Sequence, residues 1–252
     1  MSKLEIKDIY MNYHSLKGET EAIKDISFSM KEGDFLSIVG PSGCGKSTLL
    51  NIIAGLLSPS SGNIFINGKN IKDTTPQFGY MFQKDNLFEW LTVWENVILG
   101  LKIKKTLTKA TEKSIETLLH NYNLWDFKNH YPRELSGGMR QRVALIRTLG
   151  INPQVLLLDE PFSALDYQTR LNLSDEVFKI IKNENKTTIM VTHDIAEAIS
   201  MSNRILVLSK RPAIIKKDLE INFEDKYALP LERREAPNFR LYFNAIWKEL
   251  NL

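Results

Sequence analysis

The sequence predicts an α/β fold built on a mostly parallel sheet, and three observations lead to that prediction. Continuous apolar runs at Phe35–Val39, Val155–Leu158 and Thr187–Val191 are each bounded by polar residues, which is typical of strands buried on both faces of a parallel sheet. The first run leads directly into Gly40 and a glycine-rich turn, after which apolar residues recur at helical spacing. The stretch 86–148 has mostly helical patterns, so a helical subdomain is expected between two strand-rich parts.

The first third of the chain is predicted to form strands joined by tight turns. Ile26–Met30 alternates apolar and polar residues, as a half-buried strand does. Gly62–Ile66 is expected to be a further strand. It should close at Asn67-Gly68, because an Asn-Gly pair supplies the positive φ that hairpin turns need.

Helices are predicted from apolar residues at helical spacing. The helix after the glycine-rich turn should end near Gly55 and Pro59, and its apolar positions are Leu49, Leu50, Ile53, Leu56 and Leu57. A helix in the middle stretch has one apolar face, formed by Ile115, Leu118, Leu119 and Tyr122. Beyond these, Ile205–Leu208 is expected to add a strand to the sheet.

The tail begins near Lys216 and is predicted to form a loop around Leu231–Pro237. An amphipathic helix should follow, packed back on the domain, with apolar residues Phe239, Phe243, Ile246 and Leu250; a membrane-surface or partner-binding role for it is the alternative.

A chain of 252 residues can form one large domain. Within it, 1–85 and 149–215 should form a β-subdomain plus core, 86–148 the helical subdomain, and 216–252 a C-terminal helical extension.

Composition excludes several classes of protein. The net charge is +3, from 33 basic and 30 acidic residues, which argues against a dedicated nucleic-acid binder. Cys44 is the only cysteine, so no intramolecular disulfide is possible and a reducing compartment is expected. The sequence contains neither a signal peptide nor a run of about 20 apolar residues, so any work at a membrane is expected to need a partner.

The strongest local pattern fits G-x-x-x-x-G-K-[ST] between a strand and a helix. Its glycines let successive backbone N–H groups form an anion nest, to which the helix adds its positive N-terminal end. The lysine should bridge the β- and γ-phosphates, and the serine after it should bind Mg²⁺. The cysteine is expected to be incidental rather than a redox switch, although its thiol could lie close to nucleotide. The loop comprises Gly40, Pro41, Ser42, Gly43, Cys44, Gly45, Lys46, Ser47 and Thr48.

Two acidic residues follow the strand Val155–Leu158. A carboxylate at the C-terminal end of a buried strand faces the crevice where α/β folds bind ligands. Asp159 should hold Mg²⁺ through water, and Glu160 should orient or deprotonate the attacking water. General-base catalysis typically contributes about 10²–10⁴-fold. The alternative is a strand that ends in solvated acids.

A second anion site is predicted at Leu135–Gln141, directly before an apolar helix. Ser136 should cap that helix, while Gly137 and Gly138 expose backbone N–H groups.

These three motifs, in this order, resemble the ATP-binding subunit of ATP-binding cassette (ABC) transporters over nearly the whole chain. Leu135–Gln141 is similar to the family's signature motif, so Gln141 is included among the nucleotide-binding residues. The resemblance implies a phosphate-loop NTPase with a RecA-like core, an antiparallel β-subdomain and an inserted helical subdomain. It also implies an intact ATPase.

The resemblance assigns roles to four more residues. Gln83 matches the glutamine that senses Mg²⁺ and contacts the membrane partner, and His193 matches the histidine that contacts the γ-phosphate. Asp166, in Ser163–Asp166, matches the loop that crosses between two sites. Tyr13 matches the aromatic residue that stacks on adenine, with simple packing as the alternative.

In such subunits two copies sandwich two ATP molecules in a two-fold dimer. Ser136 and the amides of Gly137 and Gly138 would then contact the γ-phosphate held by the second copy. Catalysis is largely positioning and electrostatic stabilisation of the transferring phosphoryl group.

The stretch Gln83–Val97 and the tail Arg234–Leu250 resemble the nitrate, sulfonate and taurine importer branch, although Glu89 stands where that branch usually has proline. Importers of thiamine precursors share these features. The apolar residues of the stretch form either core or a groove for the membrane partner: Leu87, Phe88, Trp90 and Leu91.

The expected partners are a second copy, a membrane permease and, indirectly, a solute-binding protein, at the cytoplasmic face of the cell membrane. A soluble ABC ATPase that acts on nucleic acid or protein assemblies is the alternative.

Overall fold

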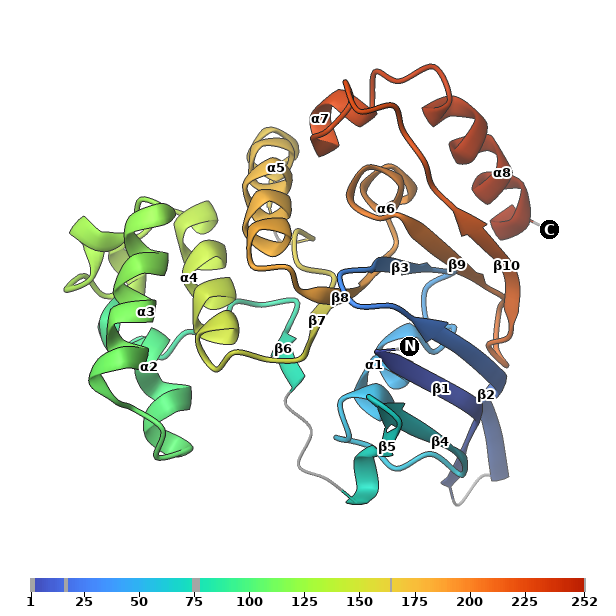
Figure 1. Ribbon diagram of the computed structural model, residues 1–252. Helices are drawn as coiled ribbons and strands as arrows, with labels where there is room; N and C mark the ends of the chain where they lie inside the picture. Colours follow the sequence, from blue (N-terminus) through green and yellow to red (C-terminus); the bar gives the residue numbers. More distant parts are fainter. Residues whose placement is uncertain (1–2, 16–17, 74–77, 164, 252) are drawn as a thin grey trace.

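The computed structural model describes residues 3–15, 18–73, 78–163 and 165–251, and within these ranges the strands form two sheets (Figure 1). The smaller sheet is antiparallel, with the order β2-β1-β4-β5. Its strands are β1 (Leu4–Ser15), β2 (Gly18–Met30), β4 (Ser61–Ile66) and β5 (Lys69–Asn70). The larger sheet has the order β10-β9-β3-β8-β7-β6. Its strands are β3 (Phe35–Val39), β6 (Phe78–Met81), β7 (Val155–Asp159), β8 (Thr187–Thr192), β9 (Arg204–Leu208) and β10 (Ile215–Glu220).

All neighbouring strands of the larger sheet are parallel except β10, which pairs antiparallel with β9 at one edge. Every residue of β3 and β8 is buried, which explains why these strands are apolar on both faces. The register aligns Val39 with Thr192 and Asp159 with Val191. The carboxyl ends of β3, β8 and β7 therefore lie at one edge, where the loops that follow them come together.

Helices cover both faces of the larger sheet (Figure 1). α1 (Lys46–Ile53) and the antiparallel sheet pack on one face. α5 (Tyr167–Asn183) and α6 (Ile195–Met201) lie on the other, and α8 (Phe239–Asn251) packs against α6 and β9. Ile246 of α8 is fully buried. The prediction that this amphipathic helix packs back on the domain is confirmed.

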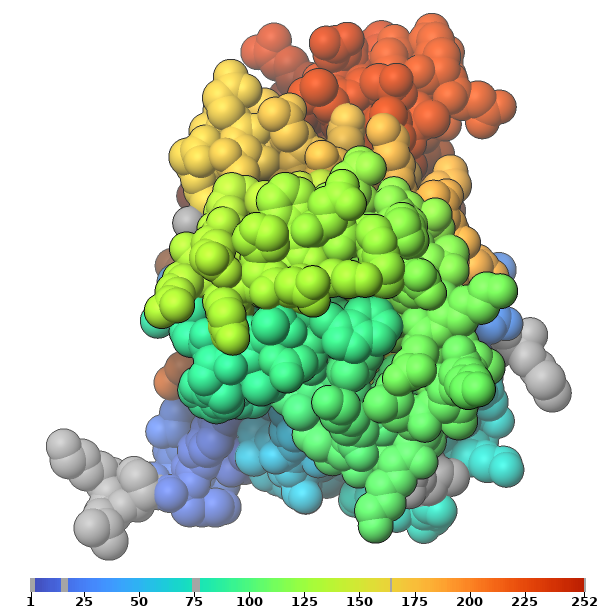
Figure 2. Space-filling model, turned by 90° about the vertical axis from the view of Figure 1, so that its left-hand side faces the viewer, coloured from blue at the N-terminus to red at the C-terminus, as the bar shows by residue number. Residues whose placement is uncertain are grey.

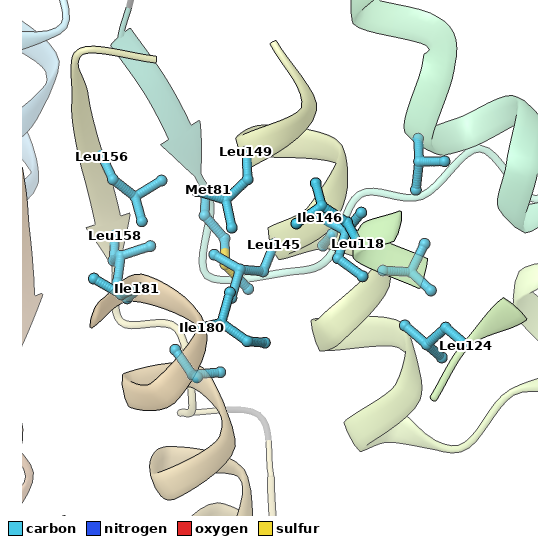
Figure 3. Packing of buried hydrophobic residues seen from close by; sticks show 14 of the residues in the cluster. Met81, Leu118, Leu124, Leu145, Ile146, Leu149, Leu156, Leu158, Ile180 and Ile181 are labelled. Atoms are coloured by element: carbon cyan, nitrogen blue, oxygen red, sulfur yellow. The ribbon is translucent and has the colours of Figure 1, made fainter. Parts of the chain in front are cut away.

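A layer of three helices extends from the β6 edge of the sheet and occupies the middle of the face seen in Figure 2. They are α2 (Val93–Ile103), α3 (Lys109–Asn121) and α4 (Gly137–Gly150), and short 3₁₀ turns occur at Ile71–Asp73, Trp125–Phe127 and Pro132–Glu134. Thr92 begins α2 with a capping box to Glu95. Figure 3 shows α4 packed next to the sheet and α5, with Leu145 and Leu149 of α4, Leu156 of β7 and Ile180 of α5 in one apolar cluster.

The structure corrects two expectations about element boundaries. The first helix ends at Ile53, close to Gly55 as expected, but Leu56 and Leu57, which were expected at helical positions, lie beyond its end. Gly55 adopts φ +74°, and the amides of Leu56 and Leu57 turn back to the carbonyl of Asn51. Leu56 is consequently 64% exposed.

The tail also differs from the prediction. The expected loop includes a short helix, α7 (Pro230–Arg233), and the tail starts inside strand β10. The subdomain limits proposed at 148/149 and 215/216 thus fall within α4 and β10.

Within the described ranges, none of the helices is both long and apolar enough to cross a membrane.

Candidate functional site: a phosphate loop and its surrounding catalytic loops

The loop after β3 surrounds the ammonium group of Lys46. This side chain is only 6% exposed, and its Nζ donates hydrogen bonds to the carbonyls of Gly40 at 2.8 Å and Pro41 at 3.0 Å. Gly45 adopts φ 122°, and an added Cβ would lie 3.2 Å from the Ala22 carbonyl, so only glycine fits this close turn. The loop therefore holds a buried cation at the N-terminus of α1, which is the arrangement that binds phosphate.

Asp159 lies beside the start of α1 at the end of β7. Ser47 Oγ donates to one carboxylate oxygen of Asp159 at 3.1 Å, and Tyr80 of β6 donates to the other at 3.1 Å. Burial raises the pKa of Asp159, and the two hydroxyl hydrogen bonds oppose that rise. Burial next to the Asp159 carboxylate also raises the pKa of Tyr80, which keeps the phenol protonated and able to donate. A hydroxyl and a carboxylate oxygen in contact fit Mg²⁺, which takes few protein ligands and keeps water and phosphate oxygens.

Glu160 has an unusual backbone. Its φ is +47°, in the left-handed region that costs a non-glycine residue of order 1–3 kcal/mol. The conformation is held by a hydrogen bond from its amide to the Val191 carbonyl at 2.8 Å. The Glu160 carboxylate contacts residues from two other loops.

Those residues are His193 and Gln83. His193 Nδ1 lies 3.1 Å from Glu160 Oε2, and Gln83 Nε2 lies 3.5 Å from the same oxygen. Gln83 also donates to Ser163 Oγ at 3.1 Å, and Ser163 in turn donates to the Glu160 carbonyl. Two residues that lie far apart in the sequence therefore converge on the Glu160 carboxylate.

The segment after Gln83 is fixed to the helical layer by two arginines of α4. Arg140 pairs with Asp85 at 2.9 Å and with Glu89 at 2.8 Å. Arg147 donates to the backbone carbonyls of Asp85 and Asn86, both at 2.7 Å. Burial acts to raise the pKa of Asp85, but hydrogen bonds from Arg140 and the Leu87 amide outweigh it and leave the pKa lowered.

Tyr13 of β1 is 42% exposed beside the phosphate loop. Its hydroxyl lies 3.3 Å from Thr48 Oγ1, which places a partly exposed aromatic ring next to the loop. The structure is compatible with the adenine-stacking prediction for this residue and leaves it a prediction.

The residues of the predicted second anion site lie apart from the phosphate loop. Ser136 caps α4 by accepting a hydrogen bond from the Met139 amide at 3.3 Å, and Asp166 caps α5 by accepting one from the Thr169 amide at 3.0 Å. The two helix starts border one hollow of about 300 Å³, lined also by Gly137 and Gly138. Across the described residues, no hydrogen bond joins Ser136 to the phosphate loop. Ala164, within the motif that ends at Asp166, lies outside the described residues.

Two predicted binding residues are buried. Gln141 is only 3% exposed and does not line the hollow next to Ser136. It therefore belongs to the interior of α4 in this structure, and its nucleotide-contacting role remains a prediction. Cys44 is 2% exposed, and burial raises the pKa of its thiol, which opposes formation of the reactive thiolate.

Sequence reasoning missed several residues that hold the site together. No role was predicted for Tyr80 or Ser163, although they contact Asp159 and Gln83 directly. No role was predicted for Arg170 or Asp194 either. Their positions, on the first turn of α5 and directly after His193, were the signal that could have found them.

The fold and the phosphate loop define a phosphate-loop nucleoside triphosphatase, and comparisons with known proteins make the class more specific. The sequence profile described as ABC transporter matches residues 23–163. The uncharacterized ABC transporter ATP-binding protein YtlC of Bacillus subtilis (strain 168) is 49% identical over 251 residues, covering 100% of this chain and 96% of that protein. The taurine import ATP-binding protein TauB of Roseobacter denitrificans is 42% identical, over 89% of this chain and 84% of its own.

Two further comparisons agree. The aliphatic sulfonates import ATP-binding protein SsuB of Bacillus thuringiensis subsp. konkukian is 42% identical, over 87% of this chain and 86% of that protein. A solved structure, the ATP-binding cassette MJ0796 as a dimer bound to ADP and Pi, has a TM-score of 0.74 and 33% identity, covering 88% of this chain and 100% of that one. This chain belongs to the ABC transporter family of ATP-binding proteins, and it is an ATPase.

Proposed function

We propose that the chain is the ATP-hydrolysing, energy-coupling subunit of a bacterial importer for a small sulfonate such as taurine, and that it acts as a two-fold dimer. The observation that carries the proposal is the separation of two half-sites on one chain. One holds Lys46, Asp159, Glu160 and His193; the other is the open hollow at Ser136. Two copies related by a two-fold axis can place each hollow over the other copy's phosphate loop.

The residues of the first half-site have distinct tasks in this proposal. Lys46 and the loop amides bind the phosphates, and Tyr13 stacks on the adenine. Glu160 positions and deprotonates the attacking water, while His193 and Gln83 hold its carboxylate in place. Ser47, Asp159 and Gln83 would hold Mg²⁺, which neutralises the charge that develops on the transferring phosphate.

The second half-site completes the reaction centre of the other copy. Ser136 and the exposed amides of Gly137 and Gly138 would contact the γ-phosphate bound there, so the dimer closes when ATP is present. Loss of that phosphate removes the contact and lets the dimer open. This change of shape is what an importer can use to move its membrane subunit.

Docking of a permease is supported by exposed aromatic residues next to Gln83. Phe82, Phe88 and Trp90 are 44%, 37% and 72% exposed. Asn96 fixes their segment with side-chain hydrogen bonds to the backbone of Phe88, Leu91 and Thr92. Exposed aromatic side chains on a rigid backbone are typical of protein–protein contact surfaces.

The choice of solute rests on the relatives, several of which are named as import proteins for taurine or aliphatic sulfonates at 41–45% identity. Nitrate and thiamine precursors are the remaining candidates of this branch.

The test uses the Glu160→Gln chain, tagged, expressed in its native cell and purified with ATP from gently solubilised membranes. Mass spectrometry should then identify a multi-spanning permease among the proteins that copurify. A tagged Trp90→Ala, Phe88→Ala variant serves as control and should recover less of it. Recovery of a soluble partner or nucleic acid, with no membrane protein, would contradict the transport role.

A further inference from the structure

A single arginine joins the loop of His193 to the loop of Asp166. Arg170 lies in the first turn of α5. Its Nη1 donates to Asp194 Oδ2 at 3.4 Å, and its Nη2 donates to the Leu165 carbonyl at 3.2 Å. The guanidinium therefore contacts the residue after His193 and the residue before Asp166 at the same time.

At the His193 end of this bridge, hydrogen bonds hold both residues next to the histidine, Thr192 and Asp194. Asp194 caps α6 by accepting a hydrogen bond from the Glu197 amide at 3.0 Å. The Asp194 amide donates to Thr192 Oγ1 at 3.1 Å, and the Thr192 hydroxyl donates to the carboxyl of Glu197, which is 3% exposed. A displacement of Asp194 therefore also displaces the backbone of His193.

The Asp166 end is equally defined. The Leu165 amide donates to the Phe162 carbonyl at 3.1 Å, and Asp166 begins α5 as its N-cap. The Leu165 carbonyl that Arg170 holds belongs to the peptide bond directly before Asp166. Its position therefore determines how Asp166 projects into the hollow next to Ser136.

The bridge is partly shielded from water. The side chains of Arg170 and Asp194 are 22% and 29% exposed, so their attraction is screened less than that of a surface pair. A guanidinium presents several N–H groups in a rigid fork, whereas an ammonium group is a single point charge. Lysine at position 170 could keep one contact but not both.

We propose that Arg170 is a positioning residue that couples the two ATP sites of the dimer. The inference rests on the proposed function, in which Asp166 lies against the other copy's site while His193 acts on the chain's own nucleotide. Closure of the partner against Asp166 shifts the Leu165 backbone, and Arg170 carries that shift to Asp194 and so to His193. Such coupling is reciprocal, because it is a free energy shared by both sites.

The experiment measures steady-state ATPase against ATP concentration for the wild-type chain and for Arg170→Met. We expect kcat to fall about ten-fold and the Hill coefficient to fall to about one, as for a charge-assisted contact between coupled groups. ATP affinity, measured in the Glu160→Gln background, should stay unchanged, because the bridge touches no residue of the phosphate loop. Arg170→Lys should recover part of kcat without the cooperativity.

Arg204 offers a matched control on the far side of the sheet. It too joins a carboxylate to a carbonyl, with Asp218 at 2.8 and 2.6 Å and the Ser29 oxygen at 2.6 Å. It begins β9, at the end of the sheet opposite the phosphate loop. Arg204→Met should therefore keep the wild-type Hill coefficient.

A double-mutant cycle tests the contact itself. Asp194→Asn keeps the cap of α6, since asparagine caps as well as aspartate, but weakens the ion pair. The double variant with Arg170→Met should be no slower than Arg170→Met alone. Additive losses, or a wild-type Hill coefficient in Arg170→Met, would overturn the inference and leave the proposed function standing. A wild-type chain whose ATPase shows no cooperativity would overturn the proposed dimer and the inference together.

Discussion

Replacement of Glu197 by glutamine should stabilise the protein, and increasingly so as the pH rises. Glu197 lies on α6, is 3% exposed and accepts a hydrogen bond from the Thr192 hydroxyl. Burial raises the pKa of its carboxyl from 4.5 to about 7, an effect that Asp194 strengthens and that Arg170 and Arg234 oppose. The native state therefore keeps a proton that the unfolded chain releases.

The sign and the size of the pH effect on the free energy of unfolding follow from the difference between the two pKa values. The pKa of the Glu197 carboxyl is higher in the native state than in the unfolded chain. The contribution of this group to the free energy of unfolding is therefore fully present below pH 4.5 and is lost as the pH rises, and the loss levels off above about pH 7. The total loss corresponds to roughly 3 kcal/mol, since one pKa unit is worth about 1.4 kcal/mol. Roughly 2 kcal/mol of it falls between pH 5.5 and 8.

Glutamine resembles the protonated carboxyl and can still accept the hydrogen bond from Thr192, but it carries no charge to titrate. Urea unfolding of wild type and Glu197→Gln at pH 5.5 and pH 8 measures the gap between them. We expect the difference in the free energy of unfolding, variant minus wild type, to increase by about 2 kcal/mol from pH 5.5 to pH 8. Glu220→Gln, at an exposed position of β10, is the control and should show a constant gap. A gap for Glu197→Gln that does not change with pH would refute the reasoning.

Three further outcomes are expected. Lys46→Ala should weaken ATP binding roughly a hundred-fold in calorimetric titration, because charged hydrogen bonds to phosphate are lost; unchanged affinity would count against the phosphate loop. Ser136→Arg should keep ATP affinity yet lower the ATPase rate at least about ten-fold by blocking closure of the dimer, and a fully active variant would argue against a composite site. Arg140→Met should lower the free energy of unfolding by about 1 kcal/mol, since it removes the pairs with Asp85 and Glu89; an unchanged urea midpoint would show that these pairs contribute nothing.

Much of the core could be predicted because its strands have a simple pattern. β3 occupies Phe35–Val39 as expected, since a run of four apolar residues and one serine between polar residues leaves few alternatives. The Asn67-Gly68 turn was predictable for a similar reason, because few residue pairs adopt positive φ in succession, and both do so here. The tail was harder. β10 alternates exposed and half-buried residues at a sheet edge, and Lys216 within it looks like the polar start of a linker.

The candidate site was predictable in its members but not in its geometry. The residues of the phosphate loop are consecutive in sequence, and Asp159 and Glu160 are neighbours of each other, so local motifs identify both groups. The positive φ of Glu160, whose carboxylate contacts His193 and Gln83, depends on a hydrogen bond from its own amide to a carbonyl of the neighbouring strand β8. The contact between Arg170 and Asp194 likewise needs α5 and α6 to pack on the same face of the sheet. Such tertiary contacts leave no local pattern.

In the proposed dimer, one chain carries two halves of a site that only a second copy completes. Size-exclusion chromatography with light scattering on Glu160→Gln, with and without Mg-ATP, tests it most directly. We expect a monomer without nucleotide and a dimer with ATP, and we expect that adding Ser136→Arg keeps the protein monomeric while ATP still binds. A Glu160→Gln chain that binds ATP tightly yet remains monomeric would contradict the composite site.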